Sequence, residues 1–189
     1  MKLTLYRADC SGDAKNCVYP HKAAIQIPKD LATAADFDHV FANYLNSYRN
    51  IDNFLESDVV PMDCDNDHSE DPKDWYSADA LEEIFADVDH IILPSRHNML
   101  PKNGRAARPR HHILFPIGVC RDAAMYTAVK SAVQKKYAFF DDNALDAARF
   151  FFGAACTADD IIWHDGFLSI DETLDDADDL EEEVDAARQ

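Results

Sequence analysis

A mixed α+β domain is the fold class that this sequence predicts, and three observations lead to it. The chain has 189 residues, 47% of them hydrophobic, which is enough for the core of one ordinary domain. Short segments with strand-like alternation are interspersed with stretches whose apolar residues recur at helical spacing. No stretch approaches the roughly 20 apolar residues that a membrane helix needs. We therefore expect a soluble, cytoplasmic protein with no membrane partner, whose five cysteines are reduced.

The N-terminal third is expected to contain two strands, a helical region and a third strand. Residues 2–7 alternate as a short strand does, and residues 19–27 fit a second strand. Residues 28–50 begin with a proline and carry apolar residues at helical spacing, which predicts one or two helices. Residues 57–67 are an apolar run that breaks into acids, typical of a buried strand that ends at a polar edge.

The rest of the chain alternates between predicted helices and predicted strands. Ser77 is placed as the N-cap of an amphipathic helix over residues 77–88, whose apolar residues recur at i, i+3, i+4 and i+7. The other predicted elements are strands at 90–95 and 111–118 joined by a basic loop, a helix at 122–137, a short strand at 138–140, a helix at 144–153 closed by Gly153, and a terminal hairpin within 160–170.

Charge is strongly segregated along the chain. The formal net charge is −18, and residues 171–189 carry ten acids against the single base Arg188. We therefore divide the chain into a folded domain at 1–170 and an acidic linker or tail at 171–189, which we expect to lead to a further C-terminal domain. Residues 96–112 contain no acid and hold five basic residues and three histidines: Arg96, Lys102, Arg105, Arg108, Arg110, His97, His111 and His112.

Acidic residues in two segments of the chain suggest a metal site. Successive strand side chains point to opposite faces, so Asp63 and Asp65 share a face. A carboxylate pair suits Mg²⁺ or Mn²⁺, and polymerases use such a pair to hold two cations. The alternative is a polar strand end with solvated acids. Asp141 or Asp142 could complete a carboxylate triad, while Asp142 or Asn143 could instead cap a helix.

Basic residues suggest a phosphate site near these acids. His112 and His111 point to opposite faces of their strand, so one of them should face the site. Arg110 could contact phosphate beside that histidine, because Arg makes bidentate phosphate contacts. Arg149 could contact a nucleotide, or form a surface ion pair with Asp146 three residues earlier.

Two other classes of site are not expected. No glycine-rich phosphate loop is present, which argues against P-loop and Rossmann chemistry. Cys10, Cys17 and His21 match no standard zinc spacing, so structural zinc is not expected.

Three segments together resemble a known family. DCDNDHSEDPKDW, PSRHNMLPKNGRAARPRHHILFPI and FFDDNALDAARFFFG resemble, in order and spacing, the three catalytic motifs of the archaeo-eukaryotic primase superfamily. More narrowly, they look like the primase-polymerase domains of bacterial phages, plasmids and mobile elements, over roughly residues 58–153. The resemblance implies an α+β catalytic core with an RRM-like mixed or antiparallel sheet flanked by helices.

The same resemblance implies a function and a set of site residues. The function is template-dependent nucleotidyl transfer, DNA primase and polymerase activity that makes or extends primers on single-stranded DNA from dNTPs or NTPs. A helicase or priming accessory domain is an expected partner. Two alternatives stay open: a metal-dependent phosphodiesterase or nuclease, and a non-catalytic DNA-binding module for replication initiation. The implied residues are Asp63, Asp65 and Asp141 for two Mg²⁺ or Mn²⁺ ions, and His112, Arg110, Arg96 and Arg149 for the nucleotide. For the template phosphates we expect Lys102, Arg105 and Arg108.

Overall fold

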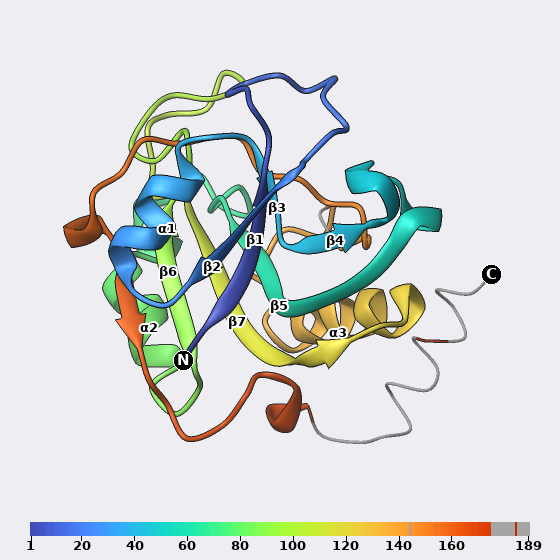
Figure 1. Cartoon of the computed structure of the whole chain (residues 1–189). Helices are drawn as coiled ribbons and strands as arrows, with labels where there is room; N and C mark the ends of the chain where they lie inside the picture. The colour runs from blue at the N-terminus through green and yellow to red at the C-terminus, as the bar shows by residue number, and fades with distance from the viewer. Residues whose placement is uncertain (144, 175–183, 185–189) are drawn as a thin grey trace.

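The computed structural model describes residues 1–143, 145–174 and 184 and confirms the α+β class (Figure 1). The helices are α1 (Pro28–Ala35), α2 (Ala78–Ile84) and α3 (Ala123–Lys136). The strands are β1 (Leu3–Arg7), β2 (His21–Ile25), β3 (His39–Val40), β4 (Ala42–Tyr44), β5 (Phe54–Cys64), β6 (His90–Pro94), β7 (His111–Cys120) and β8 (Ile162–His164). Among the described residues no helix is long and apolar enough to cross a membrane.

Two antiparallel sheets form the body of the molecule. The central sheet has the order β4-β5-β7-β6-β8, and the smaller sheet has the order β2-β1-β3. All the strand pairs in both sheets are antiparallel. The long β5 and β7 lie side by side at the centre, where Asp63 pairs with His112 and Cys64 with His111. The RRM-like arrangement that the motifs imply stays a prediction.

The central sheet is buried on both faces because its strands alternate two sets of apolar side chains. Val60, Met62 and Phe115 face α2 and α3, where Phe85 and Tyr126 complete one core cluster. The opposite face carries a second cluster beneath the smaller sheet and α1, formed by Leu3, Leu5, Ile25, Leu31, Val59, Ile91, Leu93 and Leu114. The sheet is therefore a rigid support for whatever lies at its edge.

Most predicted elements are present, and α2 begins as predicted. The Ser77 side chain accepts a hydrogen bond from the Ala80 backbone amide at 3.2 Å, which makes it the N-cap of α2. The predicted helical region at 28–50 contains one α-helix, α1, and a 3₁₀ turn at Leu45–Ser47. Its second half forms β3 and β4, because His39 pairs with Phe151 and β4 joins the edge of β5.

Three C-terminal predictions are wrong. Residues 138–140 form a turn, and the described part of 144–153 contains no helix. Phe151 is instead held extended, since its amide and carbonyl both bond the backbone of His39 at 2.8 and 2.9 Å. Gly153 does not cap a helix; its amide donates to Asp38 Oδ1 at 2.7 Å. The terminal hairpin is absent from the described residues because β8 pairs with β6.

The predicted acidic linker begins inside the packed domain. Ile170 is fully buried and Leu174 packs against the first core cluster. Asp171–Thr173 form a 3₁₀ turn between them. Residues 175–183 and 185–189 lie outside the described residues, so most of the predicted tail does too.

Candidate active site

One end of the central sheet, where its strands terminate, brings together residues from the three motifs. There β5 ends, β7 begins, and the loop between β6 and β7, yellow-green at the top of Figure 1, leaves the sheet. A cavity of about 140 Å³ lies at this end of the sheet. Its lining includes Asp63, Asp65, His112, Arg96, Arg149 and Lys102, together with Ser95, His97 and Phe150, Phe151 and Phe152.

Asp63 lines the cavity and is 4% exposed. Its Oδ2 accepts a hydrogen bond from Arg149 Nη2 at 2.6 Å. Its Oδ1 lies 3.2 Å from His112 Nε2, yet this buried oxygen has no aligned hydrogen-bond donor among the described residues. Burial alone would raise the pKa of Asp63, but His112 and Arg149 together bring it below its usual range. Asp63 is therefore a buried carboxylate that stays ionised.

His112 faces the cavity, and His111 points to the other side of the sheet edge. The adjacent β7 residues Ile113 and Leu114 belong to different core clusters, which confirms the predicted alternation. The His112 ring packs edge-on against Phe151 with 4.7 Å between centroids. Burial lowers the pKa of His112 despite the nearby Asp63. His112 is thus held in a fixed orientation, with Nε2 directed at Asp63.

Asp65 is the second acid of the cavity. It follows the last residue of β5, and its Oδ2 accepts a hydrogen bond from the Lys102 ammonium. The Arg110 Nε lies 3.9 Å from Oδ1 on the other side. The predicted pairing of Asp63 and Asp65 on one face is therefore correct, and both carboxylates line one cavity.

Asp141 lies beside this pair but does not line the same cavity. Its amide donates to the Asp63 carbonyl at 2.9 Å, which fixes it next to the end of β5. Burial and the charges of Asp65, Asp63 and Asp67 raise the pKa of Asp141 to about 7. Its side chain borders a neighbouring cavity, which Asp67 and Asp142 also line. The structure therefore places Asp141 next to the pair, and Asp142, the other candidate for the third acid, borders the same neighbouring cavity.

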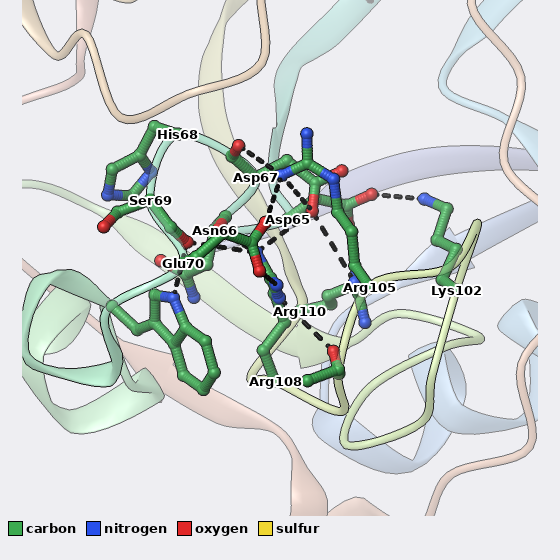
Figure 2. A network of polar contacts seen from close by, with 12 residues as sticks. Asp65, Asn66, Asp67, His68, Ser69, Glu70, Lys102, Arg105, Arg108 and Arg110 are labelled. Atoms are coloured by element: carbon green, nitrogen blue, oxygen red, sulfur yellow. Dashed lines mark hydrogen bonds and ion pairs between the residues drawn. The ribbon is translucent and has the colours of Figure 1, made fainter.

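The basic loop folds back onto the acidic segment that follows β5 (Figure 2). Arg108 is fully buried and donates to the carbonyls of Asn66 and Ser69 at 2.9 and 3.1 Å. It also pairs with Glu70 at 2.6 Å, and its guanidinium lies 4.8 Å from the centre of the Trp75 ring. Arg108 therefore has a structural role, because it holds the basic loop against the acidic segment. Template binding by Arg108 would require an exposed guanidinium, which this arrangement does not provide.

Arg110 is also fully buried and lies behind the acids. Its Nη1 donates to the carbonyls of Leu100 and His97 at 2.9 and 3.3 Å. Its Nη2 is 3.6 Å from Asp67 Oδ1. Arg110 does not line the cavity, so this arrangement fits a residue that positions Asp65 and the loop more than one that contacts phosphate.

The other predicted cations are more accessible. Arg105 is partly exposed and contacts Glu70 at 3.1 Å. Arg96 is exposed and lines the cavity, with its guanidinium 5.6 Å from the centre of the Phe152 ring. Lys102, which we expected at the template, lies instead inside the cavity. The sequence does not single out Asn66, although its side chain ties the acidic segment to the carbonyls of Tyr76 and Pro109 at 3.0 and 2.8 Å.

The carboxylates have the chemistry of a hard-cation site. They offer oxygen ligands only, the donor type that Mg²⁺ and Mn²⁺ prefer. The buried Oδ1 of Asp63 has no hydrogen bond, and burial together with the charges of Asp65, Asp63 and Asp67 raises the pKa of Asp141, so carboxylates are crowded together at the end of β5. Within residues 1–143, 145–174 and 184, however, no three His, Cys, Asp or Glu side chains converge closely enough to hold a metal ion. The carboxylate oxygens are the type of ligand that the ion prefers, and those of Asp63 and Asp65 accept hydrogen bonds from Arg149 and Lys102.

Comparison with known proteins gives one similar solved structure. No family model matches the chain, and no curated protein matches it. The primase-polymerase AEP domain of cyanophage S-2L is similar, with a TM-score of 0.48 and 11% sequence identity. The match covers 91% of this chain and 86% of the cyanophage chain.

Proposed function

We propose that this chain is a template-dependent nucleotidyltransferase, a primase-polymerase that makes or extends primers on single-stranded DNA. The observation that carries the proposal is the composition of one cavity: two buried acids, Asp63 and Asp65, face His112, Arg149 and Lys102. Acids alone would suit many metal enzymes. Acids together with cations suit a substrate that brings both metal ions and several phosphate charges.

The residues divide into two groups by chemistry. Asp63 and Asp65 would hold Mg²⁺ or Mn²⁺, and Asp141 would have to turn from the neighbouring cavity to join them. The ion when bound would activate the 3′ hydroxyl and neutralise charge on the triphosphate. His112 Nε2 and the guanidinium groups of Arg149 and Arg96 would bind the triphosphate oxygens and orient the nucleotide. The buried Phe151 holds the His112 ring in place for this contact.

The cations also favour nucleotidyl transfer over the nuclease alternative. Hydrolysis of a phosphodiester needs the acids and their metal ions but no triphosphate site, whereas three basic side chains line this cavity: Arg96, Lys102 and Arg149. The motif resemblance supports the same assignment and suggests a role in replicating a phage, plasmid or other mobile element. A helicase or accessory domain remains a proposed partner.

Primed and unprimed synthesis on single-stranded DNA tests the proposal. The assay compares Mg²⁺ with Mn²⁺ and dNTPs with NTPs, for the wild type and an Asp63→Asn, Asp65→Asn double variant. Asp58→Asn is the matched control, since Asp58 lies on the same strand but bonds Thr4 outside the cavity. We expect extension by the wild type and by Asp58→Asn and none by the double variant. Equal extension by all three would contradict the assignment, and strand cleavage without synthesis would favour the nuclease.

A further inference from the structure

Two cations of the cavity are bound to the acids that would hold the metal ions. The Lys102 ammonium donates to Asp65 Oδ2, and Arg149 Nη2 donates to Asp63 Oδ2 at 2.6 Å. Both acids are more than nine-tenths buried. Any divalent cation that binds both carboxylates therefore lies next to these two side chains, and their positive charges oppose its binding.

The two cations differ from the other bases of the loop in their freedom to move. Arg108 and Arg110 are completely buried and donate to several backbone carbonyls, so their release would break the loop. The side chains of Lys102 and Arg149 are 31% and 34% exposed. Each projects from a segment outside helices and strands, and each is held at the cavity mainly by one carboxylate.

Arg149 also has unused hydrogen-bonding capacity. Its Nε is buried and has no acceptor among the described residues, although an Arg guanidinium carries five donors arranged to bind carboxylate or phosphate. A triphosphate oxygen in the cavity would supply an acceptor for such a donor. The local charges are also balanced, because Lys102 and Arg149 offset Asp65 and Asp63 one for one.

We infer that Lys102 and Arg149 exchange partners during substrate binding: they neutralise Asp65 and Asp63 in the free protein and transfer to the triphosphate when metal ions take the acids. This inference rests on the proposed function and assigns Lys102 to the nucleotide site instead of the template. Because the exchange releases cations only when an anion is there to receive them, metal ion and nucleotide bind cooperatively. Metal ion alone binds weakly, since the bases paired with the two acids repel it.

Binding of Mn²⁺ alone tests the exchange without any dependence on catalysis. Electron paramagnetic resonance of free Mn²⁺ gives the Kd for the full chain, for Lys102→Met and for Lys22→Met. Lys22 lies on β2 outside the cavity, so its variant makes the same change in net charge. We expect Lys102→Met to bind Mn²⁺ about fivefold more tightly than the wild type, the scale of one partly exposed ion pair. We expect Lys22→Met to match the wild type.

A non-hydrolysable dNTP completes the test. It should tighten Mn²⁺ binding by the wild type more than by Lys102→Met, because the variant has no ammonium to transfer. The inference is overturned if Lys102→Met binds Mn²⁺ no more tightly than the wild type, or if Lys22→Met gains as much. Because the expected result is a gain of binding, a misfolded variant cannot imitate it.

An Asp65→Asn variant separates this inference from the proposed function. If Asp65→Asn binds Mn²⁺ as well as the wild type, the metal site itself is wrong and both proposals fail. If Asp65→Asn loses Mn²⁺ and Lys102→Met does not gain affinity, the metal site stands and the exchange alone is refuted.

Discussion

Replacing the buried Arg108 should lower the free energy of unfolding of the protein. This effect should not depend on nucleic acid. Arg108→Met keeps much of the side-chain length but removes every donor. The Asn66 and Ser69 carbonyls then lose hydrogen bonds of 2.9 and 3.1 Å from a charged group, each worth about 1.5–3 kcal/mol. Part of this loss is offset because a charged guanidinium no longer has to be desolvated. The net cost is about 3 kcal/mol.

Denaturant unfolding followed by circular dichroism measures this cost, and thermal unfolding should show a midpoint lower by about 6–12 °C. The matched control is Arg105→Met on the same loop, where the guanidinium is 38% exposed and its ion pairs are screened by solvent. We expect Arg105→Met to lower the free energy of unfolding by less than about 1 kcal/mol. Equal stability of Arg108→Met and the wild type, combined with weaker binding to single-stranded DNA, would refute this structural role. It would instead support the predicted contact between Arg108 and the template.

Two further predictions concern residues that support the cavity. Burial lowers the pKa of His39 to about 4, so the unfolded chain binds more protons between about pH 6.5 and 4. Stability is therefore full above the unfolded pKa and falls by about 3 kcal/mol as pH drops through this window, and His39→Gln should remove that part of the slope in unfolding measured at each pH. A Cβ at Gly153 would lie 2.4 Å from the backbone oxygen of Asp36, so Gly153→Ala should cost about 1–3 kcal/mol. Gly118→Ala has open space around its Cβ and should be nearly neutral; similar losses for both variants would contradict the packing argument.

The sequence predicts the sheet edge well because its signals are local. Alternation along two apolar strands is enough to place Asp63 with Asp65 and to turn His112 away from His111. The Ser77 cap and its amphipathic helix are also local patterns. These features depend on periodicity and on neighbouring residues, which a single sequence displays directly.

The sequence fails where long-range contacts decide the conformation. The spacing over residues 144–153 predicts a helix, but the Phe151 backbone bonds His39, which is more than a hundred residues away in the chain. The same extended segment turns Arg149 toward Asp63 and away from Asp146, its predicted helical neighbour. Helical spacing could not show this, because the partner strand is remote.

Burial of the loop arginines was also beyond the sequence pattern. A run of bases without acids is typical of an exposed phosphate-binding surface. The acids that receive Arg108 and Arg105 are Asp67 and Glu70, in the segment after β5. Pairing the acidic run with the basic run would have been the signal, since opposite charge runs flanking adjacent strands can neutralise each other.

The rate of single-nucleotide addition to a primed template, compared between the wild type and Asp63→Asn, shows whether this cavity carries out nucleotidyl transfer. This substitution keeps the size of the side chain but removes the charge that the cavity is built around. We expect Asp63→Asn to lower the rate by about 10²–10³-fold or more, with the fold intact by circular dichroism. A rate within about threefold of the wild type would contradict the claim that this cavity is the site of nucleotidyl transfer.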